Sequence, residues 1–353
     1  MTSVQLLSPD GTLTPSDDVP FDVTPELCRN LYRHMALARR LDEEAVALQR
    51  QGELGLWLQC AGQEAAQVGS VTALKNQDWI FPSYRDHAAA LARGISPAEL
   101  LSQWRGCSAA GWDPHAYRFH VYTLVLAAQL PQAVGFAMGA QRDSADEVVM
   151  TYFGDGASSE GDASEAFNLA ATSGAPVIFF CQNNHWAIST PSNAQSRTPI
   201  HLRAAGFGLD SYLVDGNDVL AVHAVTTMAA EQARSGSGPV LIEATTYRIG
   251  GHSTSDDPTK YRASSEVDLW RTRDPLTRLK RLLSDKRWAD HTFFTSLEDE
   301  AEQLGSDVRQ ACLSLEPQPV SEVFDLVLAG GSSSLARERD QYLEYAATFS
   351  DRG

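Results

Sequence analysis

The stretch that most constrains the fold of this chain is residues 147–186, which contains two short apolar runs. The first run, EVVMTYF at residues 147–153, is rich in β-branched and aromatic side chains and is followed at once by Gly-Asp-Gly. The second run, VIFFC at residues 177–181, has the same character and is followed by Gln and then Asn-Asn. Both runs have the composition and length of buried strands, so each polar motif stands where a strand ends.

The residues between the two runs predict a helix. Asp162 and Ser164 are candidate N-terminal caps, and Gly174 ends the helical pattern. A strand, a helix and a second strand within about 35 residues form a right-handed βαβ unit with parallel strands. This unit brings Asp155 and Asn184 to the same edge of the sheet, where open α/β sheets bind ligands.

Further patterns extend this unit over most of the chain. Apolar runs at residues 79–81, 212–215 and 239–246 predict additional strands, with helical patterns between them. Together they predict an α/β fold with a mostly parallel, doubly wound sheet of four or five strands and helices on both faces. We expect three regions: an N-terminal surface arm at 1–23, an α/β domain at 24–263 and a helical C-terminal region at 264–353.

The residue types at the predicted sheet edge indicate a metal ion and a phosphate group. Mg²⁺ takes oxygen ligands and commonly receives only one or two from the protein. Asp155 and the side-chain oxygen of Asn184 meet that requirement, while Gly154 and Gly156 allow the backbone to approach a diphosphate closely. A Gly-Asp-Gly tripeptide alone is more often an ordinary turn. Here, however, a strand precedes each motif, and 26 residues, 157–182, separate them.

Two other loops contribute candidate ligands for an anion. Tyr84 and Arg85 follow the predicted strand at residues 79–81, and arginine has the side chain best shaped to bind a diphosphate. Arg248 and His252 lie in a loop rich in Gly, Ser, Thr and Asp that follows the last predicted strand, so they belong to the same edge. Alone, a Tyr-Arg pair in a loop is more often a solvated turn than a site, and His252 alone is as consistent with an ordinary loop histidine as with a site.

Composition disfavours several classes of protein. A net charge of −17 disfavours binding to nucleic acid or to anionic membranes. The uncharged stretch at residues 119–141 is long enough to span a bilayer, but its His, Gln, Pro and Gly residues favour burial in the protein. Five scattered cysteines and an N-terminus without signal or transit features lead us to expect a cytoplasmic protein. A nucleotide enzyme is disfavoured because no G-x-x-x-x-G-K-[ST] loop is present.

Several motifs, in order along the chain, resemble one family: the α subunits of the E1 component of thiamine diphosphate-dependent 2-oxo acid dehydrogenase complexes. The spacing between Gly-Asp-Gly and Asn-Asn is similar to that of the thiamine diphosphate motif. The other motifs are LQRQGE, GQEAA, FPSYRD, QLPQAVG, VDGNDVLAV, LIEATTYR and GGHSTSDDPTKYR. The resemblance extends from about residue 26 to residue 345 and implies a thiamine diphosphate-binding fold. The loop STSDDPTKYR is more similar to the branched-chain members than to pyruvate enzymes.

The resemblance implies roles for residues of this chain. Asp155, Asn184 and the main-chain carbonyl of Trp186 match the ligands of Mg²⁺. The positions that match ligands of the diphosphate are Tyr84, Arg85, Gly156, Ala157, Arg248 and His252. Among these, His252 also matches a residue that donates a proton or stabilises charge during catalysis.

The resemblance also implies residues for the acyl pocket, and two positions of this chain differ from the pattern of the family. Leu126 matches the apolar wedge that bends the cofactor, and Leu56 and Leu126 match positions that line the acyl pocket. Gln182 stands where mammalian branched-chain members carry Arg, and Gly251 where they carry a second His. The first departure removes a positive charge near the diphosphate, and the second restricts the acid-base role to His252.

The implied reaction is the oxidative decarboxylation of 2-oxo acids such as 3-methyl-2-oxobutanoate, with thiamine diphosphate and Mg²⁺, and reductive acylation of the lipoyl group of an E2 acyltransferase. The family places a required Glu in a β subunit, so we expect an α₂β₂ heterotetramer with active sites at the α/β interfaces. Two alternatives stay open: the α subunit of a pyruvate dehydrogenase E1 component, and a non-catalytic paralogue that retains the fold.

Overall fold

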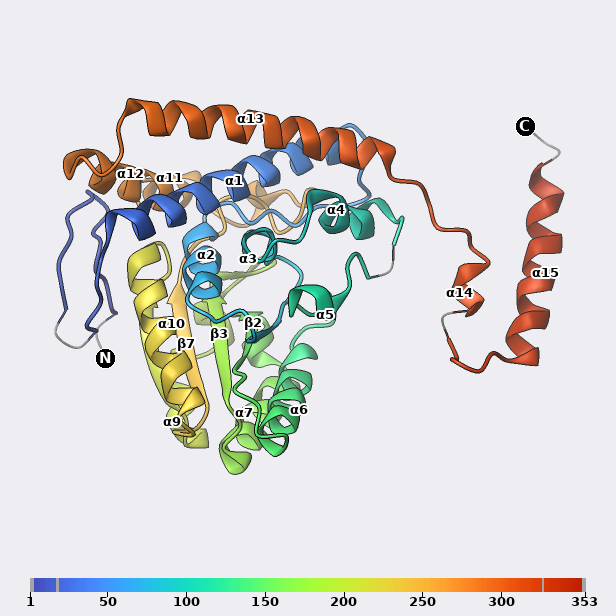
Figure 1. Cartoon of the computed structure of the whole chain (residues 1–353), viewed down its shortest axis with the longest axis horizontal. Helices are drawn as coiled ribbons and strands as arrows, with labels where there is room; N and C mark the ends of the chain where they lie inside the picture. The colour runs from blue at the N-terminus through green and yellow to red at the C-terminus, as the bar shows by residue number, and fades with distance from the viewer. Residues whose placement is uncertain (1–2, 17–18, 109, 326, 351–353) are drawn as a thin grey trace.

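The computed structural model describes residues 3–16, 19–108, 110–325 and 327–350. The ends of the predicted arm and of the predicted C-terminal region, residues 1–2 and 351–353, lie outside the described residues. In the described part, a sheet of five parallel strands has the order β1-β2-β3-β7-β6 (Figure 1). These strands are β1 (Trp79–Phe81), β2 (Val149–Gly154), β3 (Val177–Asn183), β6 (Asp210–Asp215) and β7 (Val240–Thr245). The predicted α/β fold with a parallel sheet is confirmed.

The central strand β3 shows that the sheet is buried on both faces. Ile178 and Phe180 belong to one apolar core, whereas Val177, Phe179 and Cys181 belong to the other. All five side chains are completely buried. A continuous apolar run is therefore what this position in the sheet requires, because successive side chains of a strand point to opposite faces.

Helices cover both faces of the sheet (Figure 1). The core on one face includes α1 (Pro25–Arg50), α2 (Glu64–Thr72), α3 (His87–Ala92), α4 (Pro97–Arg105) and α10 (Val219–Arg234). The core on the other face includes α6 (Gln129–Arg142), α7 (Gly161–Ser173) and α9 (Ile200–Phe207). The short helices α5 (Pro114–Tyr117) and α8 (Ser192–Gln195) lie in the connecting segments. The two covered faces make this a doubly wound sheet.

The order of the strands reverses at β7, which lies between β3 and β6. The connections that lead from β1 to β6 place α6, α7 and α9 on one face, whereas the connection from β6 to β7 places α10 on the opposite face. The strands β3 and β7 therefore form the switch point of the sheet. In open α/β sheets, ligands bind outside the carboxyl ends of the strands at such a point.

Side-chain capping accounts for the starts of some helices but not of others. Thr24 caps α1 and Asp218 caps α10 through their side chains. The prediction that Asp162 or Ser164 caps α7 is wrong, because the N-cap is Glu160 and its side chain makes no capping hydrogen bond. Asp162 lies instead in the first turn of the helix, where the helix dipole favours an acid.

The N-terminal segment packs against the domain, whereas a surface arm was expected. Leu6 and Leu7 are buried, and their backbone N–H groups donate to the carboxylate of Asp218 at 2.7 and 2.6 Å. Val4 forms a parallel bridge with Val214 of β6. Buried backbone donors need partners, and the side chain of Asp218 supplies one while it also caps α10. The expectation of a surface arm is therefore wrong for this part of the segment.

The uncharged stretch at residues 119–141 packs within the protein. Its helix α6 contributes Leu130, Ala133 and Val134 to the second core. In the part of the chain that the structure describes, no helix combines the length and the apolar character that crossing a membrane requires.

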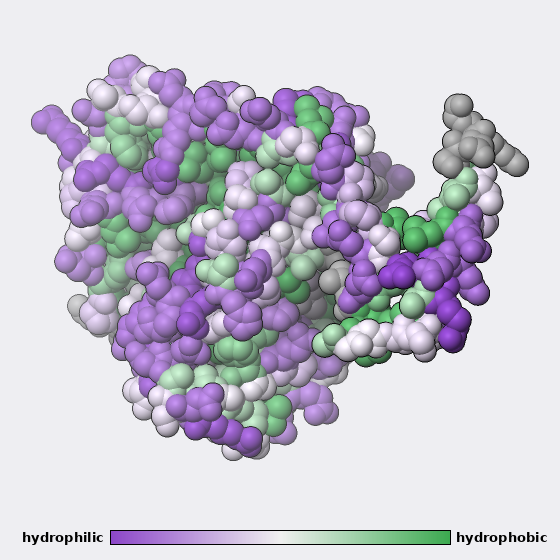
Figure 2. Space-filling model, turned by 45° about the vertical axis from the view of Figure 1, so that its right-hand side comes forward, coloured by the Kyte–Doolittle hydropathy of each residue, from purple (hydrophilic) through white to green (hydrophobic). Residues whose placement is uncertain are grey.

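The predicted C-terminal helical region has two parts. After α11 (Ser264–Arg271), the helices α12 (Pro275–Asp285) and α13 (His291–Ser314) pack against α1, and α13 runs along it (Figure 1). The helices α14 (Glu322–Asp325) and α15 (Ser333–Ser350) lie apart from the main body and expose apolar side chains among charged ones (Figure 2). The exposed apolar residues of this extension include Val320, Val323, Val327, Leu328, Leu343, Tyr345 and Phe349.

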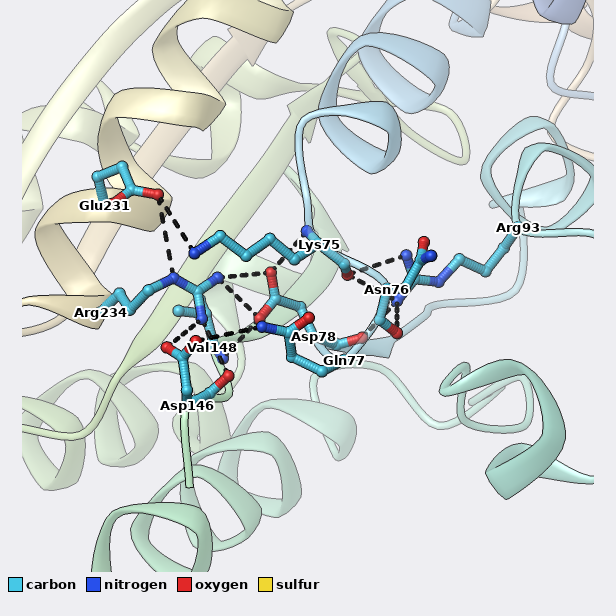
Figure 3. Close-up of polar contacts among 9 residues, drawn as sticks. All are labelled: Lys75, Asn76, Gln77, Asp78, Arg93, Asp146, Val148, Glu231 and Arg234. Carbon is cyan, nitrogen blue, oxygen red and sulfur yellow. Dashed lines mark hydrogen bonds and ion pairs between the residues drawn. The ribbon is translucent and has the colours of Figure 1, made fainter. Parts of the chain in front are cut away.

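At the amino ends of the strands, a network centred on Asp78 joins several elements (Figure 3). The buried carboxylate of Asp78 accepts the backbone N–H groups of Lys75 and Val148 at 2.8 and 2.9 Å. It also accepts two hydrogen bonds from Arg234 at 2.8 and 2.9 Å, and Arg234 pairs in addition with the exposed Asp146 at 2.9 Å. The network ties the starts of β1 and β2 to the end of α10.

Candidate active site

A cavity of about 570 Å³ lies at the carboxyl ends of β2, β3 and β7, at the switch point of the sheet. Every residue that the sequence assigned to a site lines this cavity: Leu56, Tyr84, Arg85, Leu126, Gly154, Asp155, Gly156, Ala157, Asn184, Trp186, Arg248 and His252. The structure thus brings together residues from widely separated parts of the chain. A cavity of this size at this place in an α/β sheet is the expected location of a ligand site.

Asp155 follows the last residue of β2 and is only 3% exposed. Its Oδ2 atom accepts hydrogen bonds from the hydroxyl of Ser192 at 2.7 Å and from the side-chain amide of Gln195 at 3.4 Å. Burial raises the pKa of this carboxyl, because the ionised form loses the solvation that water provides. A bound cation offsets that cost, so the environment of Asp155 suits a metal ligand.

The two asparagines after β3 play different parts. The side-chain amide of Asn183 donates to Glu243 at 2.7 Å, away from the cavity. The side-chain amide of Asn184 donates to Gln63 at 2.9 Å, and its Oδ1 accepts the backbone N–H of Trp186 at 3.3 Å. Of the pair, Asn184 lines the cavity, and Gln63 fixes the orientation of its amide.

A network of buried amides behind the cavity was missed by sequence reasoning. The Nε2 atoms of Gln63 and Gln67 donate to Oε1 of Gln182 at 2.9 and 3.1 Å, and Nε2 of Gln182 donates to the carboxylate of Asp86. Burial raises the pKa of Asp86. Gln182, which stands where mammalian relatives carry Arg, therefore has protein partners for both its nitrogen and its oxygen.

Two almost completely buried arginines, Arg85 and Arg248, line the cavity. Arg85 donates to the backbone carbonyl of His252 at 2.8 Å, and Arg248 donates to the carbonyls of Trp186 at 3.2 Å and Ile188 at 3.0 Å. Among the described residues, neither guanidinium has a carboxylate within salt-bridge distance. Burial, followed by the charge of Arg85, lowers the pKa of Arg248 to about 10. Neither positive charge is thus held in a direct ion pair with an acid, and both face a cavity that can take an anionic ligand.

His252 lies beside both guanidinium groups. Its Nδ1 atom is 3.4 Å from Nη2 of Arg85 and 3.4 Å from Nη1 of Arg248. Burial, followed by the charges of Arg85 and Arg248, lowers the pKa of His252 to about 4. The ring is therefore neutral at pH 7, and we assign its proton to Nε2 because Nδ1 faces two cationic donors. A neutral imidazole of this kind can donate a hydrogen bond from Nε2 to a bound reactant.

Two further side chains hold the loop that contains His252. The carboxylate of Asp256 accepts the backbone N–H of His252 at 2.7 Å and a hydrogen bond from the hydroxyl of Tyr261. The same hydroxyl accepts a hydrogen bond from Nη2 of Arg248 at 3.2 Å. These contacts link the position of the imidazole to that of Arg248. Neither Asp256 nor Tyr261 was assigned to the site from the sequence.

The mouth of the cavity is apolar. Leu124, Leu126 and Ile188 line the cavity and are exposed, and Val125, which stands between the two leucines in the sequence, is 72% exposed. Ile188 has a φ of 55°, a conformation that a β-branched residue rarely adopts, and its carbonyl accepts the hydrogen bond from Arg248. Exposed apolar side chains gathered at the mouth of a site are typical of a surface that another chain covers.

The residues of the cavity fit a magnesium ion bound together with a diphosphate. Oxygen atoms of Asp155, Asn184 and the carbonyl of Trp186 are ligands that Mg²⁺ prefers. No group of three or more His, Cys, Asp and Glu side chains suited to a metal occurs among the described residues, so the other ligands must come from phosphate and water. A Cβ atom on Gly156 would lie 2.8 Å from Cβ of Ala187, so this turn requires glycine.

Comparisons with known proteins agree with this geometry. Residues 32–319 match the family described as dehydrogenase E1 component. The chain is 44% identical to the 3-methyl-2-oxobutanoate dehydrogenase subunit alpha of Mycobacterium tuberculosis, over 96% of this chain and 92% of that protein. It is 35% identical to the mitochondrial 2-oxoisovalerate dehydrogenase subunit alpha 1 of Arabidopsis thaliana, over 91% of this chain and 70% of that protein.

A pyruvate enzyme is also among the relatives. The chain is 36% identical to the pyruvate dehydrogenase E1 component subunit alpha of Staphylococcus epidermidis, over 97% of this chain and 92% of that protein. All three relatives are matched along more than two thirds of their length, and the family match spans most of the chain. The chain therefore belongs to the dehydrogenase E1 component family.

Proposed function

We propose that this chain is the α subunit of a thiamine diphosphate-dependent 2-oxo acid dehydrogenase E1 component of the branched-chain type. The main support is one cavity in which the oxygens of Asp155, Asn184 and Trp186 lie together with the guanidinium groups of Arg85 and Arg248. Such a set of groups suits a divalent cation and a diphosphate at the same time. The relative from M. tuberculosis, which is similar over nearly its whole length, is named as an enzyme for 3-methyl-2-oxobutanoate.

In this proposal, Mg²⁺ binds to Asp155, Asn184 and the carbonyl of Trp186. The diphosphate binds to the residues that surround these ligands, namely Tyr84, Arg85, Gly154, Gly156, Ala157, Arg248 and His252. When bound, thiamine diphosphate supplies the electron sink that decarboxylation of a 2-oxo acid requires. The chain itself binds and orients the reactants. The two buried arginines offset the negative charge of the phosphates.

His252 is the proposed catalytic residue. Burial and the contacts with Arg85 and Arg248 keep the ring neutral and leave the proton at Nε2, so His252 can donate a hydrogen bond from Nε2 that stabilises negative charge on a reacting group. Asp256 holds the backbone of His252 and thereby the position of the ring. No other histidine lines the cavity among the described residues, which supports a role for His252 alone.

The proposed partner is a β subunit that covers the apolar mouth formed by Leu124, Val125, Leu126 and Ile188 and completes an α₂β₂ assembly. Exposure of these side chains supports a covered surface, because an apolar patch is unfavourable in water. A lipoyl-bearing E2 acyltransferase is the proposed acceptor of the acyl group. All five cysteines are unpaired, which supports a reducing compartment such as the cytoplasm.

The proposed substrate is a branched aliphatic 2-oxo acid. Leu56, Leu58 and Leu126 form part of the cavity lining, and they provide an apolar wall for an aliphatic chain. A pyruvate dehydrogenase is the second candidate, because a relative of that name is 36% identical along nearly the whole chain. One methylene group in a hydrophobic pocket is worth only about 1–3 kcal/mol, so the preference must be measured.

Decarboxylation assays with the α/β pair provide the test. We expect kcat/KM for 3-methyl-2-oxobutanoate to exceed that for pyruvate, and the opposite order would favour the pyruvate enzyme. Activity should require both Mg²⁺ and thiamine diphosphate. A pair that is folded and assembled but shows no Mg²⁺-dependent binding of the cofactor in calorimetry would instead indicate a non-catalytic paralogue.

A further inference from the structure

The segment that follows Asn184 folds back over the Gly-Asp-Gly turn. It forms the two-stranded hairpin of β4 (Trp186–Ala187) and β5 (Thr190–Pro191) and continues directly into α8. The hairpin contacts the turn closely, because a Cβ atom on Gly156 would lie 2.8 Å from Cβ of Ala187. The helix α8 therefore stands beside the carboxylate of Asp155.

Two side chains of α8 bind the same oxygen of Asp155. The hydroxyl of Ser192 lies 2.7 Å from Oδ2, and Nε2 of Gln195 lies 3.4 Å from it. The hydroxyl also lies 3.2 Å from Oδ1 of Asn183, but Ser192 has only one hydroxyl proton. The shorter contact to a charged acceptor is the stronger hydrogen bond, so the proton belongs to Asp155.

The backbone of Ser192 is fixed as well. Its N–H donates to the carbonyl of His185 at 3.0 Å, one residue after Asn184. His185 has a φ of 72°, an unusual conformation for a residue other than glycine, and this bond lies at the point where the chain turns. The hydroxyl of Ser192 is thus held between the two strand ends that provide Asp155 and Asn184.

We propose that Ser192, assisted by Gln195, is a positioning residue for the metal ion. This inference rests on the proposed function, in which Asp155 is a ligand of Mg²⁺. The hydrogen bond from Ser192 engages Oδ2, limits rotation of the carboxylate and leaves Oδ1 as the oxygen for the cation. A carboxylate that is oriented beforehand loses less conformational freedom when the metal binds. Removing such a partner typically weakens metal binding by about 10- to 100-fold.

The test is calorimetric titration of Mg²⁺ into the α/β pair at a fixed, saturating concentration of thiamine diphosphate. We expect Ser192→Ala to weaken the apparent affinity for Mg²⁺ by about 10- to 100-fold. Ser192→Thr retains a hydroxyl and should restore most of the affinity. Ser196→Ala is the matched control: the Ser196 hydroxyl donates to the carbonyl of Thr198 at 2.8 Å, and that variant should bind Mg²⁺ as the wild type does.

A second arm uses Gln195→Ala, which removes only the longer contact and should weaken Mg²⁺ binding less, in the same direction. In an Asp155→Asn background, Ser192→Ala should cause no further loss, because the two residues act through one ligand. Wild-type affinity in both Ser192→Ala and Gln195→Ala would overturn the inference while leaving the proposed function intact. A wild-type pair without Mg²⁺-dependent cofactor binding would overturn both.

Discussion

The Nδ1 atom of His252 lies 3.4 Å from Nη1 of Arg248, and Arg248 itself is 1% exposed. This contact, together with Arg85, places a histidine beside two guanidinium groups that form no direct ion pair with a carboxylate within the described part of the chain. The imidazole is consequently neutral over the whole physiological range of pH. An anion that binds between these groups gains two guanidinium donors without competing for them with an acid.

The pH dependence of stability follows from this arrangement. The unfolded chain takes up a proton on His252 near pH 6.5, but burial and the two arginines delay uptake in the folded chain until about pH 4. The unfolded state therefore binds more protons in this window, and its relative stability increases as the pH falls. We expect the wild type to lose thermal stability relative to His252→Gln between pH 6.5 and pH 4. A constant difference between the two melting temperatures across this range would contradict the assignment.

Substitution of Asp155 should separate cofactor binding from folding. Asp155→Ala removes a proposed ligand of Mg²⁺, so metal-dependent binding of thiamine diphosphate to the α/β pair should be lost while the far-ultraviolet circular dichroism spectrum is retained. Asp162→Ala is the matched control, because Asp162 belongs to the same motif but lies exposed in the first turn of α7. Binding by the Asp155→Ala pair with wild-type affinity would refute the ligand assignment.

The buried amide network predicts a cost for losing Gln182. In Gln182→Leu the side-chain N–H of Gln63 loses its acceptor, and an unsatisfied buried group costs about 1–3 kcal/mol. Asp86 loses one of its donors but keeps Ser83, and Gln67 keeps its bond to the carbonyl of Arg85 at 3.0 Å. We expect urea unfolding to show a loss of stability in that range, together with weaker cofactor binding because Gln63 orients Asn184. The matched control is Gln141→Leu. Gln141 is exposed, and its side-chain amide donates only to the carbonyl of Gly174 at 3.3 Å, so this variant should change neither the stability nor the cofactor binding.

The network at the amino ends of the strands should contribute to stability without affecting the site. Asp78→Ala removes a buried carboxylate and leaves Arg234 without its main partner, which costs about 3–5 kcal/mol (Figure 3). Asp146→Ala removes the exposed partner of Arg234 and should cost much less than Asp78→Ala, because water screens an exposed ion pair. Denaturant titrations of the two variants measure the difference. Equal decreases in the free energy of unfolding would show that the buried ion pair of Asp78 contributes no more to stability than the exposed one of Asp146.

Gly52 and Gly62 both have a positive φ, but only at Gly62 would an added Cβ atom overlap with a neighbour. Substitutions at the two positions therefore distinguish the cost of the backbone conformation from the cost of a steric clash. Gly52 has a φ of 84° with open space at the Cβ position, whereas Gly62 has a φ of 95° and its Cβ would lie 2.2 Å from the carbonyl oxygen of Tyr247. We expect Gly52→Ala to cost about 1–2 kcal/mol, for the backbone conformation alone. Gly62→Ala should cost about 1–3 kcal/mol more, because the backbone must move to relieve the overlap. Similar melting temperatures for the two variants would contradict this.

Local sequence patterns were sufficient for the sheet and for the polar ends of β2 and β3. The continuous apolar run of β3 follows from burial on both faces, and glycine and asparagine mark the points where the strands end. The proposed metal ligands Asp155 and Asn184, which follow these strands, could therefore be predicted from the sequence. Capping was less predictable, because the N-cap residue of α7 is Glu160, whose side chain makes no capping hydrogen bond.

Other parts of the site had no local signal. Gln63 precedes α2 and Gln182 lies in β3, 119 residues further along the chain. Nothing in the sequence around either glutamine indicates that their side chains form a hydrogen bond. The hairpin beside Asp155 turns at Ile188 with a φ of 55°, although glycine or asparagine is the usual residue at such a position. The turn is stabilised by the hydrogen bond from Arg248 to the carbonyl of Ile188, so its sequence lacks the residues by which turns are usually recognised.

The position of β7 has a consequence for synthesis of the chain. The strands β2 and β3 and the helix between them are local in sequence, so the pair Asp155 and Asn184 can assemble early. The strand β7 pairs with both β3 and β6, and the loop with Arg248 and His252 follows it, so these two residues join the cavity last. Until β7 inserts, one edge of β3 remains unpaired on the nascent chain, and unpaired strand edges promote aggregation. Demand for chaperones should therefore be greatest before residue 245 has left the ribosome and folded.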